Sequence, residues 1–389
     1  MVVSITRRGA VAAAVAALAL GAAACGSDNN TGGGGGGGGG SSSQGGKIAL
    51  LLPESKTTRY EQQDKPNFEN RVKEKCPSCQ VIYENAAQDP AKQQQQAESA
   101  ITNGAKVLVL DAVDVKSAAS IVARAKQSKI PVISYGRLVS DADLDYYVSI
   151  DPFKVGVQQG QALLDALKKE GKPQGPIVMI NGSPTDSNSA PYKKGAHSVL
   201  DKAGVKIAKE YDTPDWSPDK AQSEMEQALT SAGKGSIAGV YVANDGMATG
   251  VVAALKGASV DPSSLPITGQ DAEVTALQRI VAGDQLMTVY QPIRKIAYDS
   301  ADLAVALVQG KQPPDIATAK VNNGKEDVPS VLVDTEVITK DNIKSTVVKD
   351  GFVTTDQICT GPYKDGARRP GSGADGGRKP GPLAVASAA

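Results

Sequence analysis

Short apolar runs alternate with amphipathic segments along most of the chain, beginning at Lys47. KIALLLP, VLVLDAV and IPVISYG form a first series of such runs, and PIVMING, GVYVAND and LMTVYQP form a second. Continuous apolar strands of this length, separated by helices, are typical of parallel sheets that are covered on both faces. The alternation therefore predicts an α/β fold, and its two consecutive series predict two lobes.

The two ends of the chain do not follow this alternation. Residues 1–24 begin with positive charge and continue with an alanine-rich apolar run, which indicates a secretory signal peptide too short for a permanent membrane span. Cys25 follows three alanines in a pattern that resembles a bacterial lipobox, so we expect it to carry a lipid. Secretion with an unmodified Cys25 is the alternative. Residues 25–46, rich in Gly and Ser, are expected to form a flexible tether, and residues 357–389 a disordered tail.

Charge and cysteine usage narrow the classes of partner. The 42 Lys and Arg residues balance the 42 Asp and Glu residues, so no basic surface for nucleic acid is expected.

Cys76 and Cys79 stand in the sequence CPSC, whose spacing also occurs in zinc sites and redox motifs. Zinc would need two further ligands, and the single histidine, His197, is distant in the sequence. We therefore expect a local disulfide between Cys76 and Cys79, which leaves Cys359 without an assigned partner.

The stretch RLVSDADLDYYVSID carries aspartates at three alternate positions, Asp141, Asp143 and Asp145, as calcium loops do. A calcium loop of this type needs glycine at its sixth position and glutamate at its twelfth. Tyr146 and Pro152 occupy these positions, so no metal site is predicted and the aspartates are interpreted as residues that shape a turn. The chain also lacks the G-x-x-x-x-G-K-[ST] motif of phosphate-binding loops, and no cofactor is predicted.

Polar side chains follow the apolar runs, where the predicted strands end. In open α/β sheets, ligands bind outside the carboxyl ends of the strands. Amides, carboxylates and guanidiniums can pair with both the donor and the acceptor side of a hydroxyl group, and an aromatic ring can cover the apolar face of a sugar. The candidate ligand-binding residues are Arg59, Tyr60, Arg137, Asp186, Asn188, Trp216, Asn244, Asp271 and Gln291.

Structural roles compete with this interpretation. Asp186, Asp245 and Asp271 each precede a predicted helix and are also suited to cap it. Packing at a lobe surface is the alternative role for Trp216, the only tryptophan. The sequence shows few residues suited to catalysis, because a single histidine offers no evident triad base. Paired carboxylates leave a glycoside hydrolase as the enzymatic alternative, and the preferred expectation is a protein that is not an enzyme.

Several longer segments make the chain recognisable. They read RLVSDADLDYYVSID, NGSPTDSN, ANDGMATG, ITGQDAEVTALQRIVAGDQLMTVYQPI and VNNGKEDVPSVL. Over about residues 47–353 the chain resembles the D-xylose-binding proteins of bacterial ABC transporters, in the periplasmic sugar-binding family related to ribose-binding protein. The resemblance implies the type I periplasmic binding protein fold, in which two Rossmann-like lobes are joined by three crossing segments.

The resemblance also implies where the lobes divide. The crossings are expected near Asp151, Gln291 and Val321. The first lobe then comprises residues 47–152 and 292–320, and the second comprises residues 153–291 and 321–356.

The function implied is the delivery of a monosaccharide, xylose or a related sugar, to an ABC import permease and its ATPase by ligand-induced lobe closure. The protein is then expected to be a monomeric lipoprotein outside the cytoplasm, held at the outer face of the cell membrane. The same fold also serves two other functions. A sugar-sensing component for a chemoreceptor or sensor kinase is the alternative, whereas a DNA-binding repressor would carry a helix-turn-helix where this chain has its export signal.

Seven of the candidates match the sugar contacts of the resembled family: Arg59, Arg137, Asp186, Asn188, Trp216, Asn244 and Asp271. The family has tryptophan at Tyr60, Asp-Arg at Gly136-Arg137 and lysine at Gln291. We expect the missing carboxylate and lysine to remove two hydroxyl partners while the site stays nearly neutral, and Gly136 to leave extra space. The resemblance therefore predicts a sugar ligand but leaves its identity open.

Overall fold

The computed structural model describes residues 45–363. The predicted signal peptide, Cys25 and the tether up to residue 44 lie outside the described residues, as does the tail from residue 364 onward. Within residues 45–363, no helix combines the length and the apolar character that a membrane crossing requires.

A seven-stranded sheet forms the first lobe. Its spatial order is β10-β11-β5-β4-β3-β1-β2, and all neighbouring pairs are parallel except the antiparallel pair β10–β11. The strands are β1 (Lys47–Leu52), β2 (Gln80–Asn85), β3 (Ala105–Leu110), β4 (Val132–Tyr135), β5 (Tyr146–Ile150), β10 (Ala319–Asn322) and β11 (Asp327–Val333).

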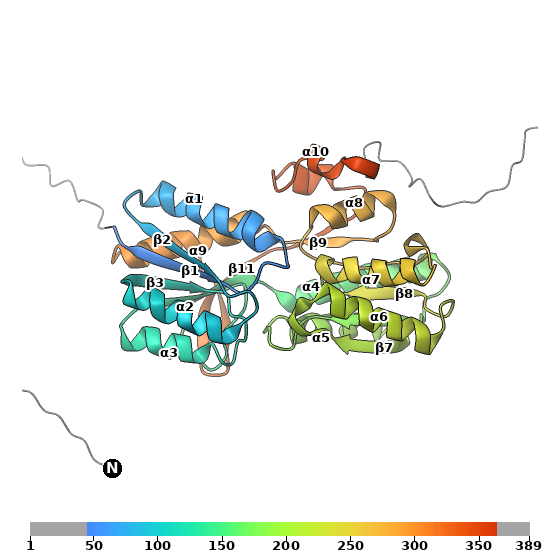
Figure 1. Ribbon diagram of the computed structural model, residues 1–389, viewed down its shortest axis with the longest axis horizontal. Helices are drawn as coiled ribbons and strands as arrows, with labels where there is room; N and C mark the ends of the chain where they lie inside the picture. Colours follow the sequence, from blue (N-terminus) through green and yellow to red (C-terminus); the bar gives the residue numbers. More distant parts are fainter. Residues whose placement is uncertain (1–44, 364–389) are drawn as a thin grey trace, which may run out of the picture. The chain divides into compact units, whose positions relative to one another are not determined.

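Helices cover both faces of this sheet. α1 and α9 lie together on one face, and α2 and α3 lie on the other (Figure 1). Their bounds are α1 (Lys65–Lys75), α2 (Pro90–Thr102), α3 (Ala119–Gln127) and α9 (Ile293–Val308), and a π-helical turn (Tyr60–Asp64) leads into α1. Residues 48–52 of β1 are fully buried between these layers, which is why the strand is apolar throughout rather than alternating.

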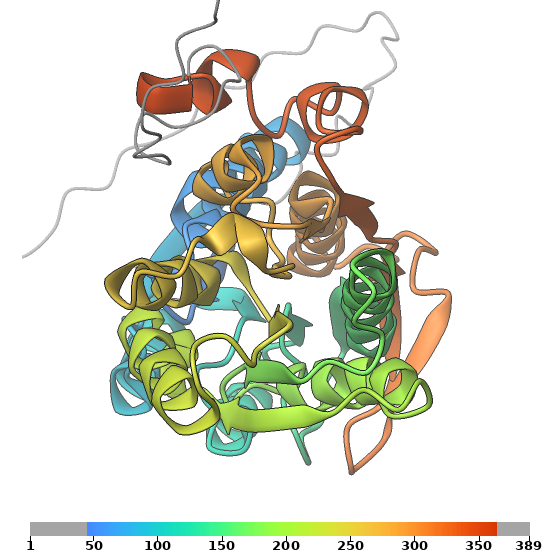
Figure 2. The ribbon, with the colours of Figure 1, turned by 90° about the vertical axis from the view of Figure 1, so that its right-hand side faces the viewer.

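The second lobe is built around the parallel strands β7-β6-β8, with β9 and β12 paired antiparallel. Isolated bridges from Ile267 to β8 and from Gln270 to β9 connect the two groups of strands. α4 and α5 pack together on one face, and α6 and α7 on the other (Figure 2). The strands are β6 (Ile177–Asn181), β7 (Ile207–Asp212), β8 (Gly239–Val242), β9 (Thr288–Tyr290) and β12 (Glu336–Ile338). The helices are α4 (Pro152–Lys169), α5 (Ser189–Leu200), α6 (Pro218–Ala232), α7 (Asp245–Gly257), α8 (Val274–Ala282) and α10 (Thr355–Ile358).

Two predicted boundaries are wrong. Residues 321–333 do not belong to the second lobe, because β11 pairs with β5 in parallel and carries β10 with it as the edge of the first sheet. The chain therefore crosses between Val333 and Glu336 rather than near Val321. The tail also starts later than residue 357, since the α8 residue Gln278 donates hydrogen bonds to the carbonyls of Gln357 and Ile358.

Local features of the first lobe stabilise its loops. A disulfide joins Cys76 to Cys79 in the turn between α1 and β2, and Cys359 in the second lobe is a free, half-buried thiol. The Asp145 carboxylate accepts hydrogen bonds from the Val132 amide at 2.7 Å and from Lys126 Nζ at 2.8 Å. It therefore ties the aspartate-rich turn to the start of β4 and to α3.

Candidate functional site

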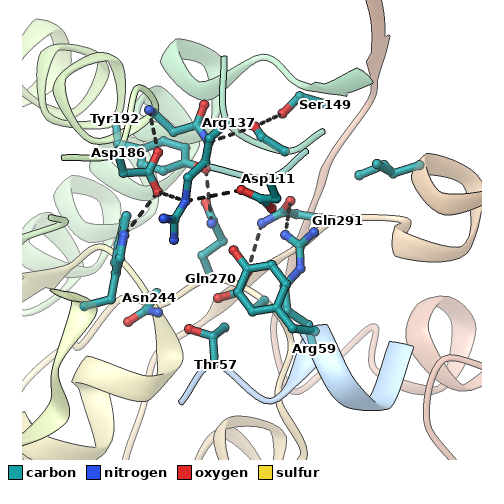
Figure 3. A pocket seen from close by; sticks show the side chains of 16 residues that line it. Thr57, Arg59, Asp111, Arg137, Ser149, Asp186, Tyr192, Asn244, Gln270 and Gln291 are labelled. Carbon is teal, nitrogen blue, oxygen red and sulfur yellow. Dashed lines mark hydrogen bonds and ion pairs between the residues drawn. The ribbon is translucent and has the colours of Figure 1, made fainter. Parts of the chain in front are cut away.

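A cavity of about 490 Å³, including its mouth, lies between residues of the two lobes (Figure 3). All nine candidate residues line it, from Arg59 and Tyr60 on the first lobe to Asn244 and Asp271 on the second and Gln291 at a crossing. The structure thus brings together side chains that are spread over more than 200 positions of the sequence. The lining also includes Thr57, Asp111, Gly136, Ser149, Tyr192, Gln270 and Ile296.

Arg59 is held rigidly at one side of the cavity. Its Nε and Nη2 atoms form a two-pronged pair with the Asp64 carboxylate, at 2.9 and 2.8 Å, and Tyr135 donates its hydroxyl to the same carboxylate. The remaining Nη1 donates to Gln291 Oε1 at 3.0 Å, and Gln291 Nε2 donates to Asp271 Oδ1 at 2.9 Å. Gln291 therefore connects a guanidinium of the first lobe to a carboxylate of the second.

A second charged group occupies the opposite side of the cavity. Arg137 Nη1 donates to the Ala112 carbonyl at 2.8 Å, while Arg137 Nε lies 2.8 Å from Asp186 Oδ2 as an ion pair without hydrogen-bond alignment. Asp186 also accepts from Trp216 Nε1 at 3.1 Å and from the Asn188 amide at 2.8 Å. The Asp186 carboxylate thus orients both a guanidinium and an indole toward the cavity.

Trp216 is 6% exposed and stands at a positive φ of 53° in the turn before α6. Its ring meets Tyr192 edge-on, with 6.3 Å between centroids. Gly182, directly after β6, allows this position, because a Cβ there would lie 2.1 Å from Trp216 Cη2 and 2.6 Å from Ser189 Oγ. The glycine of NGSPTDSN is therefore explained by close approach to the indole rather than by a turn.

Replacing Gly182 with alanine is expected to destabilise the protein by about 1–3 kcal/mol, because the new methyl group overlaps the indole. The same change should shift the emission of Trp216, the only tryptophan of the chain. Thermal unfolding and intrinsic fluorescence measure these two effects. Gly235→Ala is the matched control, since no atom lies within 4 Å of a Cβ placed there. Equal stability of the two variants would contradict this packing argument.

The capping alternative does not account for the second-lobe carboxylates. The residue that caps α7 is Asn244, whose Oδ1 accepts from the Met247 amide at 3.0 Å, and this cap does not use its Nδ2 donor. Asp245 is fully buried and accepts from the Glu273 amide at 3.1 Å, so it supports the loop before α8 rather than the cavity. Asp271 precedes α8 without capping it, because the N-cap position belongs to Glu273.

The Asp271 carboxylate is 5% exposed, and burial raises its pKa to about 7, although the Arg59 charge pulls the pKa down. Its backbone φ of 96° is unusual for a residue with a side chain. A carboxylate that is both desolvated and held in a strained backbone conformation is typical of functional sites.

The expectation of extra space beside Gly136 is wrong. A Cβ at this position would lie 2.5 Å from Asp111 Oδ2, so the carboxylate of Asp111 fills the space that the missing side chain leaves. Asp111 follows β3 directly and enters the cavity from the neighbouring strand. Asp111 could not be predicted from the sequence, because VLVLDAV is apolar on both sides of the aspartate and shows no strand end there.

Several hydrogen bonds join the lobes outside the cavity, and four of them are here called the rim bonds. They are Thr58 N to Glu273 Oε1 (3.2 Å), Gln88 Nε2 to Asp215 O (3.2 Å), Val115 N to Thr185 O (3.1 Å) and Leu138 N to Ser187 Oγ (2.7 Å). None of their eight residues lines the cavity. The rim bonds therefore connect the lobes independently of anything that the cavity holds.

Chemically, the cavity is a set of fixed donors and acceptors around one indole and two phenol rings. Three carboxylates and two guanidiniums line it, together with the amides of Asn188, Asn244, Gln270 and Gln291. No histidine, cysteine or lysine is among the lining residues. Such a lining is suited to holding a small polyhydroxylated molecule by many hydrogen bonds.

Comparison with known proteins agrees with this geometry. Residues 48–312 match the family model described as periplasmic binding protein domain. The chain is 36% identical over 316 residues to a D-xylose-binding periplasmic protein of Haemophilus influenzae, covering 80% of this chain and 92% of that protein. It is 34% identical over 289 residues to a multiple sugar-binding periplasmic receptor of Rhizobium radiobacter, covering 69% and 81% respectively.

A solved structure shows the same fold. It is an ABC transporter solute-binding protein from Clostridium phytofermentans with bound β-D-glucose, 28% identical, with a TM-score of 0.71 over 80% of this chain and 99% of that one. The predicted class, two α/β lobes of the type I periplasmic binding protein fold, is confirmed. The chain belongs to the periplasmic binding protein family.

Proposed function

We propose that this protein binds an uncharged monosaccharide, xylose or a related sugar, and presents it to an ABC import permease and its ATPase. The observation that carries the proposal is the convergence of the nine candidate residues on one cavity with donors, acceptors and a single indole. The relatives with bound or named sugars support the same class of ligand.

The charges of the lining favour an uncharged ligand. Asp111, Asp186 and Asp271 outnumber Arg59 and Arg137 among the lining residues, and Arg59 is already paired with Asp64. Arg137 is likewise paired with Asp186, so no free lining cation would balance the charge of an anionic sugar acid in this desolvated space. A neutral sugar meets no such penalty, since each of its hydroxyl groups can both donate to a carboxylate and accept from a guanidinium or amide.

Delivery requires that the permease distinguish loaded from empty protein, and we propose lobe closure as that signal. A sugar held by Arg59 and Arg137 on one lobe and by Asn244 and Asp271 on the other would stabilise the closed arrangement selectively.

We also propose that the protein works outside the cytoplasm, anchored through lipidated Cys25. Membrane fractionation of the Cys25→Ser variant tests the anchor.

The decisive experiment is a titration with pentoses, hexoses and disaccharides, followed by Trp216 fluorescence and by calorimetry. One equivalent of a neutral monosaccharide is expected to bind, raise the thermal unfolding temperature and be recovered chemically unchanged. Binding of no sugar would overturn the proposal. Consumption of the sugar would instead indicate a glycoside-processing enzyme.

A further inference from the structure

Asp111 has the environment of a residue that lacks its partner. Its side chain is 1% exposed, yet neither carboxylate oxygen takes part in a hydrogen bond within the described structure. The nearest cation is Arg137, whose Nε lies 3.5 Å from Asp111 Oδ1, too far and too poorly aligned for a hydrogen bond. A buried carboxylate without hydrogen bonds is costly, so its retention calls for an explanation.

The surroundings of Asp111 show which way the unused oxygens face. The carboxylate lines the cavity together with Arg59 and Arg137, and Figure 3 shows it beside Arg137. Burial raises the pKa of Asp111, whereas Arg137 and Arg59 oppose that rise. A hydroxyl group in the cavity would supply the missing donor.

Gly136 belongs to the same arrangement. Its φ is +66°, and the three atoms nearest to a Cβ placed there are all carboxylate atoms of Asp111, at 2.5, 3.2 and 3.5 Å. A side chain at position 136 and a carboxylate at position 111 therefore compete for the same space. Asp and Asn tolerate a positive φ better than other residues do, so the conflict comes from Asp111 rather than from the backbone alone.

We propose that Asp111 accepts a hydrogen bond from one particular hydroxyl of the sugar, and that Asp111 and Gly136 act as one specificity-determining pair. The proposal rests on the proposed function, because it names the residue that selects among sugars at the same site. The carboxylate enters from the end of β3 rather than from the end of β4. Asp111 therefore favours a sugar that has a hydroxyl group pointing toward the end of β3.

The test combines variants of this pair with altered sugars. The probes are D-xylose or D-glucose, whichever the wild type binds, and the derivatives of that sugar that lack the hydroxyl at carbon 2, 3 or 4. Asp111→Ala is expected to weaken binding of the parent sugar roughly 10- to 100-fold, the effect of losing a hydrogen bond to a charged group. One deoxy sugar should bind the wild type and the alanine variant almost equally, because it lacks the hydroxyl that Asp111 holds.

The matched control is Asp114→Asn in the same loop. The Asp114 carboxylate accepts from the amides of Lys116 and Ser117 at 3.0 and 2.8 Å and does not line the cavity. Its replacement should leave both the affinity and the deoxy-sugar profile unchanged.

A second measurement tests the steric coupling without any sugar. Gly136→Asp should lower the unfolding temperature, and adding Asp111→Ala should recover part of that loss, because all three crowding atoms are then removed. Strict additivity of the two changes would refute the coupling.

The outcomes separate the two proposals. If the wild type binds no sugar, the proposed function fails. If the wild type binds sugar but Asp111→Ala retains full affinity, or weakens all deoxy sugars and the parent equally, only the role of Asp111 is overturned.

Discussion

Replacing Trp216 with alanine is expected to lower sugar affinity by at least 100-fold, equivalent to about 2.7 kcal/mol. The indole is the only tryptophan ring of the chain and lines the cavity at 6% exposure. Its loss removes the flat apolar surface on which a sugar ring can lie, together with the Nε1 donor that holds Asp186 at 3.1 Å. Asp186 would then be held only by the Asn188 backbone amide and by its ion pair with Arg137.

The Trp216→Phe variant separates these two contributions. Phenylalanine keeps an aromatic face but cannot donate to Asp186, so an intermediate loss of affinity is expected. Calorimetric titration measures both variants, and thermal unfolding without sugar reports any general loss of stability. Sugar affinity that is unchanged in the alanine variant would remove Trp216 from the site.

Replacing Asp271 with alanine is expected to weaken sugar binding by a similar factor. The carboxylate is one of two second-lobe carboxylates that line the cavity, and its loss also leaves Gln291 Nε2 without the acceptor at 2.9 Å. A lost hydrogen bond to a charged group and an unsatisfied amide add to the cost. Calorimetry with the best sugar of the panel measures the effect, and wild-type affinity in this variant would contradict the assignment.

Asp271→Asn provides a pH-dependent control in the absence of sugar. Burial raises the pKa of Asp271 in the folded protein to about 7. Because this pKa is raised, the contribution of Asp271 to stability is fully present when the pH is below the pKa of an aspartate in the unfolded chain. The contribution is lost as the pH rises through about 7. The difference between the pKa values of Asp271 in the folded and unfolded chain corresponds to about 4 kcal/mol of stability at most.

Asparagine does not titrate, so the variant should gain stability relative to the wild type between pH 5 and pH 8. The expected gain is at least about 1 kcal/mol, or about 2 °C in the unfolding temperature. A stability difference that is the same at both pH values would show that Asp271 is not desolvated in solution.

The layer structure could be predicted from the sequence because each strand is buried on both faces. A continuous apolar run such as residues 48–52, bounded by helical segments, is typical of a covered parallel sheet, and short loops then place consecutive strands near one another. The lobe of the hairpin β10–β11 could not be predicted in this way, because its sheet partner is distant in the sequence. Its turn, VNNGKEDV, is a clear local signal, but which sheet edge it joins depends on pairing with β5, far away in the sequence.

The site could be predicted where a polar residue follows an apolar run, as Arg137 and Asn244 do. Tyr192 was missed because it lies within helix α5, where an aromatic residue normally signals packing. Asp111 was missed for want of a visible strand end, and the space beside Gly136 was misjudged because that space depends on a neighbouring strand. Contacts between adjacent strands are set by sheet order, which a single sequence does not display.

The rim bonds have a consequence for how such a protein could be tuned. Under the proposed closure, they stabilise the closed arrangement by the same amount whichever sugar is bound, since their residues do not reach the cavity. Stronger rim bonds would raise the sensitivity to every sugar together and leave discrimination among sugars untouched. They would also raise the fraction of empty protein that is closed, and hence the background of futile encounters with the permease. The rim bonds then set the sensitivity to sugar and the fraction of empty protein that is closed. The lining residues of the cavity set the selectivity among sugars.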